Sequence, residues 1–164
     1  MKYKIVDNFL AEDEFLPIKN CVLYNNRFPW YLANGVAEPG DGDSYFFHEF
    51  YNFDAPMCEH FDLLVPLFRK LNVASLIRAK ANLYMRGEEV VEHETHEDQT
   101  YKHSGCIIYL NTCDGYTKIA DGTKIFSVEN RALFFDSSTP HCSTNCTDEL
   151  YRSNINVNYF EMVQ

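Results

Sequence analysis

The stretch Arg152-Ser153-Asn154-Ile155-Asn156-Val157-Asn158-Tyr159-Phe160 alternates between polar and apolar side chains from Asn154 onward. Residues two apart in a β-strand point to the same face, so this alternation predicts a strand with one polar and one apolar face. The polar face has two explanations: it contacts solvent, or it lines the interior of a barrel. In the second case, the Arg152 guanidinium could bind a carboxylate through two parallel hydrogen bonds.

Further strands are predicted upstream of this stretch. Every second residue between Ile77 and Leu83 is apolar, and the apolar runs 107–110 and 132–135 are bounded by polar turns. Aromatic residues make up 15% of the chain, which also favours β structure. We therefore expect a β-barrel core over about residues 76–162.

The residues before this core, about 1–75, are predicted to support it with helices. Apolar residues recur at helical spacing from Phe15 to Leu23 and again from Met57 to Leu71, where Pro66 must kink the helix or start it afresh. No repeat or linker marks a boundary, so we expect one domain over residues 1–164.

Between the two helices, the sequence predicts a turn and an aromatic strand. Pro39-Gly40-Asp41-Gly42-Asp43 is rich in turn residues and could form a mobile loop that covers a substrate groove. Residues 45–53 are predicted as a strand with many aromatic side chains, and a shorter strand is expected within residues 2–10.

Composition limits the classes of partner. The formal net charge is −10 and no basic cluster is visible, which makes nucleic acid an unfavourable partner. No apolar run approaches the roughly 18 residues that span a bilayer. The six cysteines lack the spacing of a disulfide framework and no signal peptide precedes them, so we expect free thiols in the cytoplasm. The oligomeric state is left open.

Two His-x-Asp motifs occur, and local geometry separates them. His60-x-Asp62 lies in a helical stretch, where residues two apart diverge, whereas His96-x-Asp98 lies in the β-rich part, where they share a face. His141, which follows a predicted strand and turn, could add a second imidazole. Two histidines and one carboxylate form the triad that binds non-haem Fe(II) and leaves positions open for other ligands. His93 is less suitable because it falls on the opposite strand face from His96. His103 is less suitable because it lies in the polar turn before Gly105.

These residues together resemble the Fe(II)/2-oxoglutarate-dependent dioxygenases, and among them the prolyl-hydroxylase-like branch with its compact phage and bacterial members. The resemblance covers about residues 77–160. It rests on the order and spacing of His96-x-Asp98, Ile107-Ile108-Tyr109-Leu110-Asn111, Asp114-Gly115-Tyr116-Thr117, Phe135-Asp136, His141 and Arg152-x-x-Ile155-x-Val157-x-Tyr159-Phe160.

The resemblance implies a fold and a set of roles. The fold is a double-stranded β-helix (jelly-roll, cupin-like), mainly β, with N-terminal α-helices packed on the major sheet. His96, Asp98 and His141 would bind iron. Arg152 would pair with the distal carboxylate of 2-oxoglutarate, and the further residues expected to bind this co-substrate are Tyr109, Tyr84 and Asn156. The segment from Tyr84 to His96 departs from the family, because it keeps only Gly87 where many prolyl hydroxylases have several glycines.

The implied activity is that of an oxidoreductase. With Fe(II), 2-oxoglutarate and dioxygen as cofactors, and ascorbate as a further reductant, it would hydroxylate a C–H bond of a peptide or protein substrate, such as a prolyl residue. Succinate and carbon dioxide would be released.

Four alternatives are kept. A nucleic-acid repair demethylase of the same family usually has a second arginine six residues after the first, and Asn158 stands there. A small-molecule or free amino-acid hydroxylase would use the same site. A non-enzymatic cupin-like binding module would keep the barrel without needing Arg152. Finally, His141 with Cys142 and Cys146 could suggest zinc.

Overall fold

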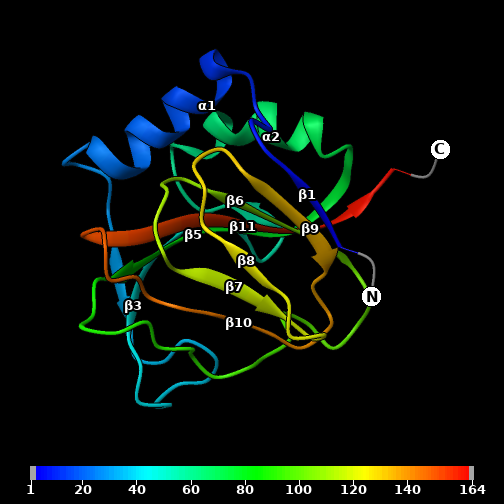
Figure 1. The fold of residues 1–164 in the computed structure, drawn as a ribbon. Helices are drawn as coiled ribbons and strands as arrows, with labels where there is room; N and C mark the ends of the chain where they lie inside the picture. The colour runs from blue at the N-terminus through cyan, green and yellow to red at the C-terminus, as the bar shows by residue number, and fades with distance from the viewer. Residues whose placement is uncertain (1–2, 163–164) are drawn as a thin grey trace.

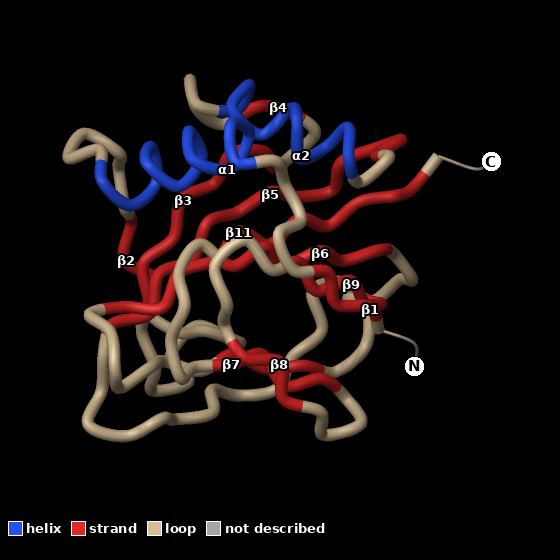
Figure 2. The backbone as a smooth tube through the Cα atoms, turned by 45° about the horizontal axis from the view of Figure 1, so that its top comes forward, coloured by secondary structure: helices blue, strands red, loops and turns tan. Residues whose placement is uncertain are grey.

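The alternating stretch is β11 (Tyr151–Glu161), a central strand of the larger of two antiparallel sheets. The computed structural model describes residues 3–162 of the chain. The larger sheet has the order β1-β9-β6-β11-β5-β3-β2, with β4 paired to β3, and the smaller sheet has the order β10-β7-β8. Figure 2 shows α1 and α2 along one face of the larger sheet and the smaller sheet opposite its other face.

The strands follow one another along the chain as Figure 1 shows. The larger sheet is built from β1 (Lys4–Val6), β2 (Tyr31–Ala33), β3 (Tyr45–Asn52), β4 (Ala55–Pro56), β5 (Val73–Met85), β6 (Ser104–Tyr109), β9 (Ala132–Asp136) and β11. The smaller sheet is built from β7 (Tyr116–Ile119), β8 (Lys124–Phe126) and β10 (His141–Ser143). The first 75 residues thus supply strands as well as the helices expected there.

The two predicted helices are present, but each is shorter than the stretch of helically spaced apolar residues that predicted it. Helix α1 (Glu12–Lys19) begins with three acidic residues, which are favourable at the positive end of a helix, and continues as a π-helical turn, Asn20–Tyr24. A 3₁₀ turn (Phe61–Leu64) precedes α2 (Val65–Lys70), whose second residue is Pro66. Proline starts the helix afresh here, because the first turn does not need its missing N–H.

The polar face of β11 is buried, which decides between its two explanations. Arg152, Asn154, Asn156 and Asn158 are at most 7% exposed, so they line an interior rather than a surface. The opposite face of β11, from Ile155 to Tyr159, packs into the apolar core beneath the helices. That core also contains Phe15, Ile18, Leu64, Leu67, Ala79, Ala81, Cys106, Ile108 and Leu110. The larger sheet therefore buries an apolar face against helices and a polar face against the smaller sheet.

The structure confirms the aromatic strand at residues 45–53 as β3 and the short N-terminal strand as β1. Within residues 3–162, no helix is both long and apolar enough to cross a membrane.

We expect Ile155→Ala to lower the free energy of unfolding by about 2–5 kcal/mol, because the side chain is fully buried between β11 and the helices and its loss leaves a cavity. Leu150→Ala, just before the same strand, is the control: its side chain is 63% exposed, and the change should stay within about 0.5 kcal/mol. Urea unfolding measures both. Equal losses would mean that this face of β11 is not part of the core.

Candidate metal centre and anion pocket

His96, Asp98 and His141 converge between the two sheets. The sequence predicted a strand around His96, but the structure has no regular strand there. The segment lies alongside β10 through isolated bridges, and the backbone N–H and C=O groups of His96 and His141 exchange two hydrogen bonds of 2.9 Å. The Asp98 N–H donates to the Ser137 carbonyl at 3.1 Å. Ligand atoms of the three side chains lie within 4.8 Å of one another. The sequence motif is therefore assembled by pairing with a distant segment.

Both imidazoles are oriented by backbone carbonyls. Nδ1 of His141 lies 2.9 Å from the Thr139 carbonyl, and Nδ1 of His96 lies 3.4 Å from the Glu94 carbonyl. A carbonyl only accepts, so Nδ1 carries the proton and Nε2 keeps its lone pair, the usual arrangement of histidines that bind metals. Nε2 of His141 is 3.7 Å from Oδ2 of Asp98. The donor set fits a divalent metal of the Fe(II) class.

Asp98 is a fixed anion. Its Oδ2 accepts hydrogen bonds from Ser137 Oγ (2.5 Å), Asn158 Nδ2 (2.9 Å) and Asn156 Nδ2 (3.1 Å), and its Oδ1 accepts one from Arg78 Nη2 (2.5 Å). Burial alone would raise the pKa of this carboxyl group, but the Arg78 charge, His141 and the hydrogen bonds outweigh it and hold the pKa well below its usual range. Oδ1 keeps one lone pair for a cation.

Arg152 lies fully buried at the other end of the same interior. Nη1 donates to the Thr144 carbonyl at 3.1 Å and Nη2 to Thr117 Oγ1 at 2.9 Å, while the buried Nε has no partner. The guanidinium carbon is 5.6 Å from the Tyr84 ring centre and 5.4 Å from that of Tyr109. No acidic side chain within residues 3–162 forms an ion pair with it. A buried cation without a counter-charge is unfavourable, so this pocket is suited to an anion.

The other residues predicted to bind the co-substrate lie in or beside this interior. The Tyr109 hydroxyl donates to Thr117 at 2.9 Å, so Tyr109 and Arg152 share one acceptor. Tyr84 stacks on Tyr45, with ring centres 5.5 Å apart. Asn156 donates to Asp98, which places it beside the metal ligands rather than beside Arg152.

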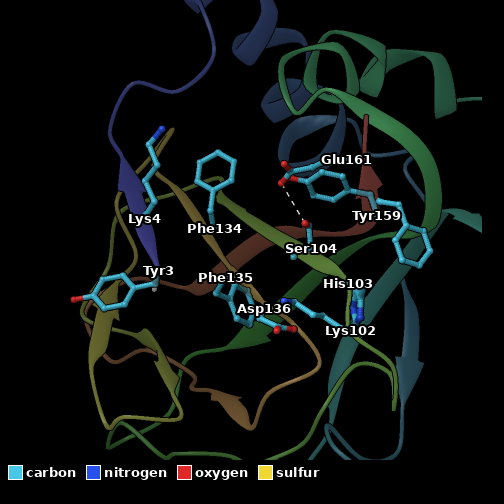
Figure 3. A pocket seen from close by; sticks show the side chains of 12 residues that line it. Tyr3, Lys4, Lys102, His103, Ser104, Phe134, Phe135, Asp136, Tyr159 and Glu161 are labelled. Carbon is cyan, nitrogen blue, oxygen red and sulfur yellow. Dashed lines mark hydrogen bonds between the residues drawn. The ribbon is translucent and has the colours of Figure 1, made fainter. Parts of the chain in front are cut away.

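A small cavity of about 40 Å³ borders the metal cluster and reaches two residues that contact Arg152, although Arg152 itself does not line it. Its lining includes His96, Asp98 and His141 from the metal cluster, and Tyr84 and Thr117 from the surroundings of Arg152. A larger hollow of about 630 Å³ lies elsewhere, where β1, β9 and the end of β11 meet (Figure 3). Its wall contains none of the three metal-ligand candidates.

The predicted turn Pro39-Gly40-Asp41-Gly42-Asp43 belongs to the loop of residues 34–44, but none of these five residues lines the cavity, so its role as a cover of a groove stays a prediction. Val36 lines the cavity together with His96. The Asp41 carboxylate accepts hydrogen bonds from the N–H groups of Asp43 (3.0 Å), Ala37 (2.8 Å) and Val36 (2.8 Å), which lower the pKa of Asp41 to about 2. A single side chain thereby holds this loop in shape.

The histidines that were set aside lie apart from the metal cluster. His60 stacks on Phe28, near His48. His93 lies over Tyr84 and its Nδ1 contacts Ser143 Oγ at 2.9 Å, and His103 contacts Asn158. Among the described residues, the zinc alternative is not assembled: Cys146 groups with Cys113 and Asp148 rather than with His141 and Cys142.

Comparison with known proteins gives matches at the level of structure. No family model matches the sequence, and no curated protein is similar to it. A Pseudomonas putida prolyl-4-hydroxylase is 15% identical, with a TM-score of 0.65 over 97% of this chain and 92% of that one. A Burkholderia pseudomallei oxidoreductase of the 2OG-Fe(II) oxygenase family is 11% identical, with a TM-score of 0.70 over 96% and 84%. The fold is that of the 2OG-Fe(II) oxygenases.

This oxygenase fold also occurs in a non-heme alpha-ketoglutarate-dependent epimerase, SnoN from nogalamycin biosynthesis, which is 12% identical with a TM-score of 0.64 over 97% of this chain and 78% of that one. The predicted double-stranded β-helix is confirmed by these matches. Their low identities carry the likeness no further than the fold.

Sequence reasoning missed several residues of the site. Arg78 and Lys80 share the polar phase of β5 with Tyr84, so the same alternation that revealed β5 could have pointed to them. Thr117 stood in the motif Asp114-Gly115-Tyr116-Thr117 but was given no role, and Thr144 carries no periodic signal, because the contacts of both residues with Arg152 arise from long-range packing against β11.

We expect Thr117→Val to lower the free energy of unfolding by about 2 kcal/mol, because it removes the acceptor of a buried Arg152 N–H and of the Tyr109 hydroxyl without changing the size of the side chain. Thr117→Ser keeps the hydroxyl and should cost no more than about 1 kcal/mol for the lost methyl group. Chemical denaturation compares the two. Equal losses would show that the hydroxyl does not support Arg152.

Proposed function

We propose that this protein is an Fe(II)- and 2-oxoglutarate-dependent oxygenase that hydroxylates a C–H bond and releases succinate and carbon dioxide. One observation carries the proposal: a cluster of two histidines and one carboxylate lies in the same interior as a buried arginine that has no acidic partner among the described residues. A metal ion would bind the histidine and carboxylate cluster, and a dicarboxylate would pair with the arginine.

In this proposal, His96, Asp98 and His141 hold Fe(II). The carbonyls of Glu94 and Thr139 keep the protons on Nδ1, so that both Nε2 lone pairs remain available. Arg78 and Ser137 fix the carboxylate of Asp98 and keep it ionised. The bound metal, with its co-substrate and dioxygen, supplies the oxidising power.

Arg152 binds the distal carboxylate of 2-oxoglutarate. Thr117 and the Thr144 carbonyl orient the guanidinium, and the rings of Tyr84 and Tyr109 cover it and exclude water. A guanidinium in such dry surroundings binds a carboxylate more strongly than one in water, because the local dielectric constant is low. A cupin-like binding module without an anionic co-substrate would have no use for this buried charge.

The substrate has two candidates. A peptidyl residue such as proline follows from the resemblance to prolyl hydroxylases. A small molecule, including a free amino acid, is favoured by polar residues on the cavity floor. A single domain, a cytoplasmic location and ascorbate as reductant stay predictions.

Anaerobic addition of Fe(II) and 2-oxoglutarate should produce a visible metal-to-ligand charge-transfer band, because the keto acid would chelate the metal in the open positions. Asp98→Ala and His141→Ala should abolish the band. A native protein without the band contradicts the oxygenase proposal, whereas a band that survives both substitutions contradicts the ligand assignment.

Arg152→Ala should weaken 2-oxoglutarate binding by about 100-fold and leave Fe(II) binding within about threefold, because the guanidinium lies away from the metal ligands. Arg152→Lys, which keeps the charge but not the two-pronged geometry, should fall between. Titration of the charge-transfer band reports the co-substrate, and fluorescence quenching by the metal reports iron. Equal loss of both affinities would argue against the role given to Arg152.

A further inference from the structure

The cavity contains a second cation without an acidic partner. Lys80 of β5 lines it together with His96, Asp98 and His141. Its Nζ donates to the Tyr45 hydroxyl at 2.8 Å and lies 5.2 Å from the centre of that ring. None of the acidic side chains in residues 3–162 lies within ion-pair distance of it. At most one of its three N–H groups is therefore used by a described contact.

The charges around Lys80 do not compensate it. Burial and the neighbouring Arg78 lower the pKa of Lys80 to about 7, against the opposing effects of Asp98 and Glu49. The Asp98 carboxylate is already paired with Arg78, and Glu49, which stands opposite Lys80 on β3, accepts a hydrogen bond from Asn52. An anion entering the cavity would supply the missing counter-charge.

Two neighbouring amides lack hydrogen-bond donors. The Asn82 amide nitrogen donates to Asn154 at 3.0 Å and the Asn156 amide nitrogen donates to Asp98 at 3.1 Å, which fixes both side chains. The buried Oδ1 atoms of Asn82 and Asn156 have no partner, and both residues line the cavity. A buried acceptor without a donor is costly, so the cavity floor is suited to a ligand that brings N–H or O–H groups.

2-Oxoglutarate does not match this set of groups. As a dianion it carries no hydrogen-bond donor, and in the proposed function its two ends are already bound by Arg152 and the metal. Arg152 pairs with Tyr84 across β11 and β5, whereas Lys80 stands four residues earlier on β5, about 13 Å along the strand. The Arg152 guanidinium donates a hydrogen bond to Thr117, whereas the Lys80 ammonium group donates one to Tyr45. Lys80 thus belongs to a second subsite.

We propose that Lys80, Asn82 and Asn156 bind the primary substrate through a free carboxylate and an adjacent N–H group, which makes that substrate a free amino acid. This inference rests on the proposed oxygenase function. Lys80 meets the carboxylate, and the two amide oxygens accept from the amino group. A neutral residue inside a peptide chain, such as proline, has no carboxylate to offer at this position.

A neighbouring hollow favours a zwitterion over a simple carboxylic acid. This hollow beside His96 is bordered by Glu38, Glu94 and Glu97. A free amino acid presents an ammonium group to these carboxylates, which a simple carboxylic acid lacks.

The test uses the whole protein loaded anaerobically with Fe(II) and 2-oxoglutarate. The twenty amino acids are titrated as free acids and as carboxamides, together with an internal prolyl peptide blocked at both ends, while the charge-transfer band is followed. We expect at least one free acid to bind about tenfold or more tightly than its amide. In air, the same acid should stimulate succinate formation.

Lys80→Met should reduce the affinity for that acid by about tenfold and leave the amide unaffected, because only the acid uses the ammonium group. Half-saturation by 2-oxoglutarate should change by less than about twofold. Lys118→Met is the control, since Lys118 pairs with the exposed Glu92 and does not line the cavity. Lys80→Arg keeps the charge and should keep the preference for the acid over its amide. It serves as the second variant if Lys80→Met does not fold.

Several results would overturn the inference: an amide that binds as tightly as its acid, binding of the blocked peptide in preference to every acid, or no binding by any acid. A loss of 2-oxoglutarate affinity in Lys80→Met, equal to the loss for the acid, would assign the ammonium group to the co-substrate instead. The charge-transfer band of the native protein without added amino acid is the reference. If this band is present, the results above contradict only the amino-acid inference; if it is absent, the oxygenase proposal itself fails.

Discussion

The buried carboxylate of Asp98 is the interaction on which the interior depends. It joins Arg78 of β5, Ser137 after β9, and Asn156 and Asn158 of β11, so three separate segments of the chain meet on the side chain of a fourth. A carboxylate away from water is tolerated only when it is paired and hydrogen-bonded. The inward faces of β5 and β11 must therefore be polar, and their apolar residues are directed to the helices.

Charge is distributed unequally between the inside and the outside of this protein. The chain has an excess of ten acidic residues, yet its interior contains Arg78 beside Asp98, Lys80 in the cavity and the fully buried Arg152. Of these three cations, only Arg78 forms an ion pair with Asp98. The net charge, which argues against nucleic acid, thus says nothing against an anionic ligand. In the proposed function, the cost of burying Arg152 and Lys80 without counter-charges would be recovered when anions bind, and this cost would contribute to binding affinity and selectivity.

Much of the fold could be predicted from the sequence because local periodicity is strong where both faces of a strand are buried. The alternation after Asn154 identified β11, and parity separated His96-x-Asp98 from His60-x-Asp62. The sequence could not decide whether the polar face of β11 met solvent or an interior, because both give the same pattern. Nor could it show that the segment of His96 is held by bridges to β10 rather than by a regular strand, since that pairing joins residues far apart in the chain. The contacts of Thr117 with Arg152 depend on the same long-range packing.

The loop of residues 34–44 reaches the cavity through Val36, but the floor is made by β5, where alternate residues contribute to different parts of the candidate site. Arg78 holds the metal-ligand candidate Asp98, Lys80 and Asn82 face the cavity, and Tyr84 covers Arg152. Because the period of a strand is two, a slip of one residue would turn all four away together. In the proposed function, the register of this one strand would couple metal binding, co-substrate binding and the choice of substrate, and pairing with β3 on one side and β11 on the other fixes that register.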